Sequence, residues 1–120
     1  MVLSPVLECK FFIPIRRDAN LAHGELHDPS LWNWLTNELF NRFQGGTAAP
    51  GMYQGFYEDP DTGQRVSDES YMFIVAVDEP RVDELRQLLS GVCVLFEQKC
   101  IYLSVAGRVE FIEEPNRDPS

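Results

Sequence analysis

Apolar residues along this chain recur first with the period of a strand, then with that of a helix, and the two periods alternate. Read from residue 8 to residue 105, the order is strand, helix, strand, strand, helix, strand. This order is typical of an α+β domain with both helices on one face of an antiparallel sheet, the ferredoxin-like βαββαβ sandwich. We therefore predict one such domain, with a core over about residues 8–112 and a flexible tail over 113–120.

The expected boundaries follow from the alternation and from turn residues. Strands are predicted at 8–15, 52–58, 70–77 and 100–105, with a start of the third as early as Val66 left open. A fifth short strand is predicted at 108–112, after the turn at Ala106-Gly107. The second helix is expected to begin near Asp78, and two ends stay open, at Gly91 or beyond Val92, which would extend its apolar stripe.

The first helix has a well-marked start, because Asp28 is a good N-cap and Pro29 suits the first helical position. Steps of 100° place one apolar stripe on this helix, formed by Trp32, Leu35, Leu39 and Phe43. Trp34 projects away from the stripe, where an indole needs a cover. It is therefore a candidate ligand-binding residue.

The strand at 70–77 is apolar on both faces. Tyr71 and Phe73 alternate with Met72 and Ile74, yet two helices cover only one face of a sheet. A second copy of the same sheet is a common cover for the other face. We predict a homodimer.

The composition narrows the possible partners. The 120 residues carry a net charge of −9, and no basic run reverses it locally, so nucleic acid and anionic membranes are not expected partners. No apolar run approaches the ~20 residues of a membrane span, and no signal peptide is recognised. The three cysteines lack C-x-x-C spacing, and a reduced, cytoplasmic setting is expected.

Polar residues should gather at one end of this fold, where the first and third strands and both connecting loops meet. The set consists of Arg16, Arg17, His23, Glu25, His27, Asp68, Glu69, Gln98 and Lys99. Arg16, His23 and Gln98 are candidate ligand-binding residues, and the guanidinium beside a helix N-terminus favours a small anionic or carbonyl-bearing ligand. Solvated loops with screened ion pairs are the alternative interpretation.

Three residues are candidates for catalysis. Glu69 aligns with Tyr71, and on the covered face it would have a raised pKa and could act as a general base, with Tyr57 or His27 as hydrogen-bond donor. Tyr57 shares one strand face with Tyr53, and a lined cavity or a dimer interface is the favoured role for these rings.

A metal site was considered in the loop that holds His23 and His27. Glu25 and Asp28 lie beside them, but a convincing third ligand is missing. We predict no metal and no cofactor.

Several short motifs resemble an uncharacterised family of small bacterial α/β proteins with a ferredoxin-like fold. They are Trp32 through Leu35, Arg42-Phe43-Gln44-Gly45-Gly46-Thr47, Asp68-Glu69-Ser70 and Phe96-Glu97-Gln98. The resemblance would cover most of residues 9–112 and implies no particular activity. This chain departs from the pattern in its longer histidine-containing loop and in lacking an export signal.

Three functions stay open. The leading hypothesis is a small-ligand-binding or regulatory module that acts as a homodimer. The second is a cofactor-independent enzyme of the dimeric α/β-barrel type, in which a carboxylate transfers a proton. The third is a protein-interaction adaptor. A buried carboxylate inside an enclosed cavity would favour the enzyme, and a filled sheet interface without a cavity would favour the adaptor.

Overall fold

The computed structural model describes residues 5–17, 24–49 and 51–115, and these form one antiparallel sheet with two helices. His23 and the last five residues of the predicted tail lie outside the described residues. The strands are β1 (Val6–Pro14), β2 (Thr47–Ala48), β3 (Tyr53–Glu58), β4 (Arg65–Asp78), β5 (Cys100–Val105) and β6 (Arg108–Glu113). The helices are α1 (Pro29–Phe43) and α2 (Val82–Leu95), and the 3-10 turn η2 (Glu79–Arg81) precedes α2.

The α+β class is confirmed, but the sheet is larger than the four or five strands predicted. Its order is β2-β4-β1-β5-β6, and β3 also pairs with β4. The extra C-terminal strand is present as β6, whereas β2 was missed because two residues are too few to show an alternation. The early start of the third strand is the correct one, since β4 begins at Arg65.

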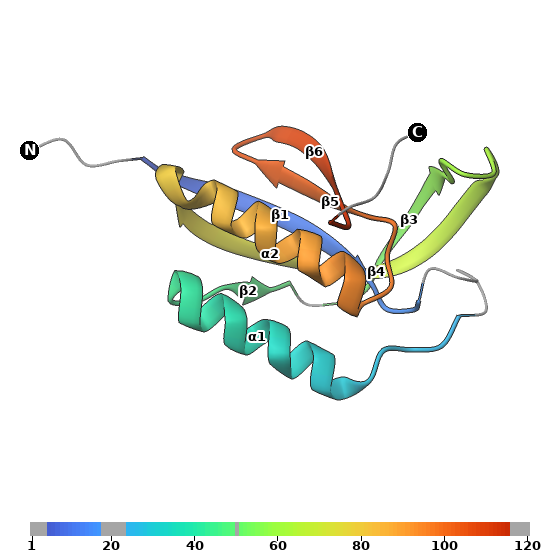
Figure 1. The fold of residues 1–120 in the computed structure, drawn as a ribbon, viewed down its shortest axis with the longest axis horizontal. Helices are drawn as coiled ribbons and strands as arrows, with labels where there is room; N and C mark the ends of the chain where they lie inside the picture. Colours follow the sequence, from blue (N-terminus) through green and yellow to red (C-terminus); the bar gives the residue numbers. More distant parts are fainter. Residues whose placement is uncertain (1–4, 18–23, 50, 116–120) are drawn as a thin grey trace, which may run out of the picture.

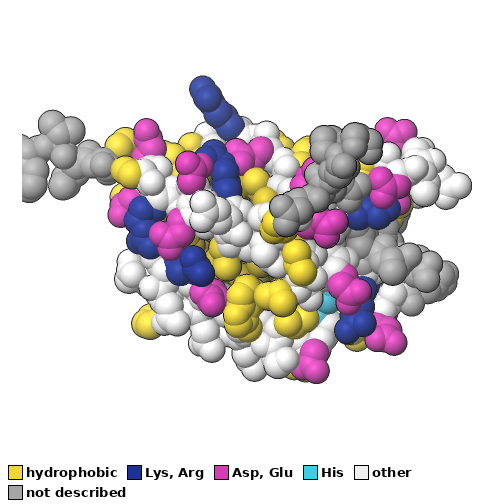
Figure 2. Space-filling view, in the orientation of Figure 1, with side chains coloured by type: hydrophobic (Ala, Val, Ile, Leu, Met, Phe, Trp, Pro, Cys, Tyr) yellow, Lys and Arg dark blue, Asp and Glu magenta, His cyan; other side chains and the backbone are white. Residues whose placement is uncertain are grey.

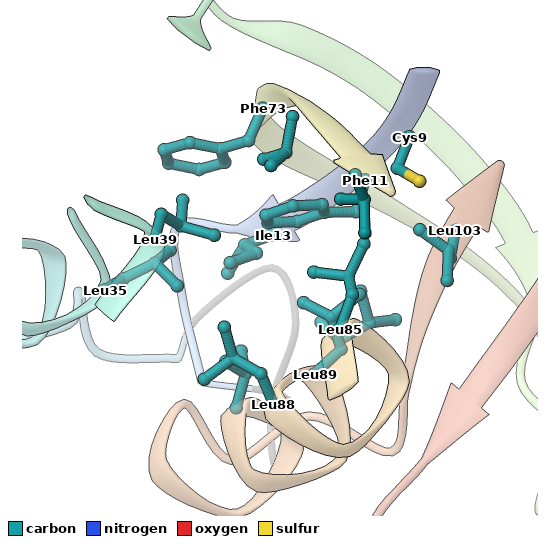
Figure 3. Close-up of a cluster of buried hydrophobic side chains, with 14 of the residues drawn as sticks. Cys9, Phe11, Ile13, Leu35, Leu39, Phe73, Leu85, Leu88, Leu89 and Leu103 are labelled. Carbon is teal, nitrogen blue, oxygen red and sulfur yellow. The ribbon is translucent and has the colours of Figure 1, made fainter. Parts of the chain in front are cut away.

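Both helices lie on the same side of the sheet (Figure 1). On β1, Cys9, Phe11 and Ile13 face the helices and are completely buried, as the alternation predicted. Figure 3 shows Phe11 and Ile13 between the leucines of α1 and those of α2. Figure 2 views the molecule from the helix side, where hydrophobic side chains reach the surface between the helices and acidic and basic side chains are mixed around them.

The start and the stripe of α1 are as predicted. The Asp28 carboxylate accepts the N–H of Ser30 at 2.9 Å, and Pro29 is the first helical residue. Leu35, Leu39 and Phe43 are buried, and the helix ends at Gln44, which adopts a left-handed conformation with φ of 61°.

The second helix continues past Gly91, which decides between the two ends that the sequence left open. Val92 and Cys93 are buried against the sheet, and this packing outweighs the low helix propensity of one glycine. Among the described residues no helix is long and apolar enough to cross a membrane.

Tyr71 and Phe73 of β4 both face the helices. Phe73 stacks on Phe11 with ring centroids 5.4 Å apart, and Tyr71 meets the edge of Trp32 at 5.1 Å. The face left open by the helices therefore carries the even-numbered residues of β4, such as Met72 and Ile74, which are half-buried.

Strand β4 is longer than the strand beside it. Its pairing with β1 begins at Ser70, opposite Pro14, so residues 65–69 pair only with β3. The segment 53–69 is therefore a hairpin that projects from the sheet, and we call it the arm (Figure 1). The arm is the feature that creates the site described next.

Candidate functional site

A cavity of about 290 Å³ opens on the face of the sheet opposite the helices. The arm contributes Tyr53, Gln54, Gly55, Phe56, Tyr57 and Asp68. The rest of the sheet contributes Phe12, Pro14, Ser70, Gln98, Cys100, Tyr102 and Phe111. The cavity is thus a cleft between the arm and the body of the sheet, at the low end of the size range of small-molecule sites.

Aromatic rings form most of the cavity wall. The Phe12 ring meets Tyr53 edge-on at 5.7 Å and Tyr102 edge-on at 5.4 Å, and Tyr102 meets Phe111 at 5.9 Å. Edge-to-face contacts hold the rings in place and leave π faces available to a ligand. Such a surface can stack on a heterocyclic base and can attract a cation through the ring quadrupoles.

Asp68 is the carboxylate among the residues that line the cavity. Its Oδ1 accepts a hydrogen bond from the Ser70 hydroxyl at 3.5 Å, and Ser70 is buried. Gly55 lies opposite Asp68 in the β3–β4 register, and a Cβ built on Gly55 would lie 3.2 Å from Asp68 Oδ1. A side chain at position 55 would therefore crowd the Asp68 carboxylate, and glycine avoids this contact.

Two of the candidate residues line the cavity. Tyr57 is half-buried in the arm, and Gln98 is 3% exposed. Gln98 Nε2 donates to the backbone oxygens of Arg16 at 2.8 Å and of Phe96 at 2.9 Å. These bonds use both amide protons, so Gln98 supports the wall and has no amide N–H left to donate to a ligand.

Glu69 does not line the cavity. It projects on the same side of β4 as Tyr71, as predicted, but it is exposed, because this part of the arm extends past the helices. The burial that a catalytic role of Glu69 would require is therefore not found, and Glu69 belongs to the exposed beginning of the strand. Asp68, one residue earlier, belonged to the polar set predicted for this end and was not singled out as the carboxylate of the site.

His27 is buried next to the cavity wall but does not line it. Its Nε2 donates to the Pro14 carbonyl at 2.8 Å, and among the described residues no polar group pairs with Nδ1. The ring packs edge-on against Phe96 at 4.9 Å and Trp32 at 5.7 Å. Burial lowers the pKa of His27, which favours the neutral ring.

Arg16 and Trp34 are not among the residues that line the cavity. Arg16 shares one end of the fold with Glu69, as predicted, since the neighbouring Ile15 N–H donates to Glu69 O at 2.9 Å. The Arg16 guanidinium donates to the backbone oxygen of Gly24 at 3.0 Å. Trp34 is half-buried against the core, and His23 lies outside the described residues.

The requirements of a reactive thiol and of a metal site can be compared with the described residues. Cys93 is buried, and burial raises the pKa of its thiol to about 12, so it is not a thiolate at neutral pH. In the part of the chain that the structure describes, no three His, Cys, Asp or Glu side chains come together in a way that could hold a metal ion.

Solved structures similar to this chain come from a bacteriophage enzyme. The chain matches a phage SAM lyase in complex with S-methyl-5'-thioadenosine with a TM-score of 0.69 and 14% identity, over 98% of both chains. A phage SAM lyase in the apo state matches with a TM-score of 0.59 and 15% identity, over 93% of this chain and 92% of the other. No protein-family model and no curated protein sequence matches the chain.

At this level of identity the likeness shows that the chain shares the fold of these enzymes from end to end. The predicted resemblance to a bacterial family of unknown function stays a prediction.

Proposed function

We propose that this chain is an enzyme that cleaves a sulfonium compound of the S-adenosylmethionine type in the cavity between the arm and the sheet. The observation that carries the proposal is the wall of aromatic rings around one carboxylate, Asp68. A sulfonium ion is a cation attached to apolar groups, and aromatic faces with a nearby carboxylate attract such ions. The fold shared with a SAM lyase along nearly the whole chain supports the choice of substrate.

This proposal replaces the anionic or carbonyl-bearing ligand predicted from the sequence with a cation that carries a nucleoside group. The net charge of −9 attracts a cationic substrate, and the aromatic rings offer a stacking surface for the base. The core strands β3, β4, β1 and β5, with α1 and α2, supply the ferredoxin-like frame that we predict for this enzyme.

Lysis of the carbon–sulfur bond leaves the electron pair on sulfur, which becomes a neutral thioether. Tight binding of the cation does not by itself speed this step, because the charge on sulfur disappears as the bond breaks. The carbon that loses its bond to sulfur must form a new bond, and the substrate itself can supply that bond in two ways. Either the substrate's own carboxylate attacks this carbon to form a lactone, or the adjacent carbon gives a proton to a base and an alkene forms. In the second route we propose that Asp68, the carboxylate on the cavity wall, is the base that accepts this proton.

Turnover is tested by incubating the purified protein with S-adenosylmethionine and following S-methyl-5'-thioadenosine and the second product by mass spectrometry. We expect the thioether to appear, with a lactone or an alkene as its partner. Binding of S-adenosylmethionine without turnover would contradict the enzyme and favour the ligand-binding or regulatory module. The absence of both binding and turnover would contradict the proposed function as a whole.

We also propose a homodimer that meets through the open face of the sheet. Val109 and Phe111 on β6 are 51% and 63% exposed, and Phe111 is part of the cavity wall. A partner on this face would cover apolar surface.

A further inference from the structure

One ion cluster joins the tip of the arm to the body of the molecule. The Lys99 ammonium lies 3.0 Å from both carboxylate oxygens of Asp59 and 2.9 Å from Asp61 Oδ2. The two aspartates belong to the β3–β4 turn, whereas Lys99 directly precedes β5. We call these three residues the clasp.

Hydrogen bonds within the β3–β4 turn fix the position of the Asp59 carboxylate. Asp59 Oδ1 accepts the N–H of Asp61 at 2.8 Å, and the backbone of Asp59 is bonded to Gln64 O and Gly63 N, each at 2.8 Å. The Asp61 N–H and then Lys99 lower the pKa of Asp59, and the two aspartates raise the pKa of Lys99. Both shifts favour the charged forms of Asp59 and Lys99 at neutral pH.

The clasp connects the two walls of the cavity. Lys99 stands in the chain between Gln98 and Cys100, which line the wall on the body. Asp59 follows the arm strand that carries Tyr53 and Tyr57, which line the opposite wall. Apart from the Ile15 N–H bond to Glu69 O at the base of the arm, residues 65–69 of β4 pair only with β3, so no other strand in the described part of the chain fixes the angle of the arm at its tip.

We propose that Lys99 is a positioning residue, which through Asp59 and Asp61 holds the arm at the distance from the sheet that the ligand requires. This inference rests on the proposed function, because it concerns the cavity in which that function places the substrate. Lys99 acts on the ligand through the arm and does not touch the reacting atoms.

Salt provides a specific test of this role. The Lys99 side chain is 29% exposed and that of Asp61 is 50% exposed, so dissolved ions screen their attraction. S-methyl-5'-thioadenosine is uncharged at neutral pH, and its own binding has no ionic contact to screen. A salt dependence of its affinity therefore reports on the protein and not on the ligand.

The experiment measures the Kd of S-methyl-5'-thioadenosine for the unmodified protein and for Lys99→Met, Lys99→Arg and Lys10→Met, at low and high salt. Lys10→Met is the matched control, because Lys10 pairs with Glu8 at 3.2 Å outside the cavity and its loss changes the net charge equally. Amide hydrogen exchange of the same four proteins, without ligand, reports on the arm directly.

We expect Lys99→Met to raise the Kd at least about threefold, to remove its salt dependence, and to speed exchange only in the arm. Lys99→Arg should restore the affinity, and Lys10→Met should leave it unchanged. An unchanged Kd in Lys99→Met overturns the inference.

If the unmodified protein binds neither S-methyl-5'-thioadenosine nor S-adenosylmethionine, the proposed function fails and exchange alone decides on the clasp. Faster exchange confined to the arm of Lys99→Met then supports it, and unchanged exchange overturns it.

Discussion

Asp68 and Glu69 are adjacent in the sequence but project on opposite sides of β4. Asp68, paired with Gly55, lines the cavity on the open face, whereas Glu69, paired with Gln54, is exposed on the side of the helices. The two carboxylates differ by one CH₂ group and by their position relative to the aromatic wall. They therefore form a matched pair for testing the site.

Replacing Asp68 should weaken the binding of a cationic ligand. We expect Asp68→Asn to raise the Kd of S-adenosylmethionine about 10- to 100-fold, because the variant lacks a carboxylate that faces the positive charge. The Kd of the neutral S-methyl-5'-thioadenosine should change much less. Glu69→Gln is the control and should bind both compounds like the unmodified protein. Equal losses for both compounds, or a larger loss in the Glu69 variant, would contradict this assignment.

Gly55 offers a way to disturb Asp68 without changing any charge. The Cβ of Gly55→Ala would lie 3.2 Å from Asp68 Oδ1, so the carboxylate must shift and the affinity for S-adenosylmethionine should fall. Gly91→Ala is the control, because a Cβ at Gly91 meets nothing within 4 Å. Within a helix this second change should raise the stability by about 0.5–1 kcal/mol and leave binding unchanged. Calorimetric titration and thermal unfolding of both variants separate the two effects.

The sequence predicts most of the core of this fold, because burial imposes a period that survives in the residues. Cys9, Phe11 and Ile13 alternate toward the helices, and Asp28 with Pro29 marks the start of α1. The strand β2 could not be predicted, because two residues form no pattern. The sequence left the end of α2 open, because a glycine can stop a helix and the pattern does not show that burial of the residues that follow outweighs it.

The cavity was harder to predict than the core. Alternation places Asp68 and Tyr57 on one face of the arm, but it does not show that the arm curls over this face. Lys99 and Asp59 are 40 residues apart, and their contact depends on the angle of the arm. Charged residues at exposed turns carry no period from which such a contact could be inferred.

Packing at the centre of α1 should respond strongly to a cavity-forming change. Leu39 is 3% exposed within the hydrophobic core, so Leu39→Ala should lower the free energy of unfolding by about 2–5 kcal/mol. Urea denaturation followed by tryptophan fluorescence measures the difference. Phe40→Ala is a suitable control, because Phe40 is 65% exposed and its loss should cost far less. An unfolding midpoint of Leu39→Ala within error of the unmodified protein would be inconsistent with the packing of α1 on the sheet.

The predicted homodimer calls for a direct measurement of mass. Light scattering of the unmodified protein should give about twice the monomer mass of 13.7 kDa. Phe111→Glu places a charge on the exposed open face and should shift the protein toward the monomer, whereas Phe40→Glu on the helix side should not. A monomeric unmodified protein would remove the basis for this assembly.

His27 should make the protein less stable in mild acid. Its Nε2–H donates to Pro14 O, and Nδ1 has no hydrogen-bond partner in the part of the chain that the structure describes, so a second proton would add a charge next to Trp32 and Phe96. Burial lowers the folded-state pKa below 6.5, and the nearby Arg17 lowers it further, whereas Glu97 and the hydrogen bond to Pro14 oppose this shift.

Between the two pKa values the unfolded chain binds more protons than the folded chain, so stability falls as the pH drops below the ordinary value of 6.5 toward the lowered folded-state pKa. Below the folded-state pKa both forms carry the proton and His27 causes no further change. Thermal unfolding across this range should show a smaller loss for His27→Gln than for the unmodified protein, because glutamine keeps a donor for the Pro14 carbonyl and does not titrate. The same pH dependence in both proteins would mean that other groups cause the acid sensitivity.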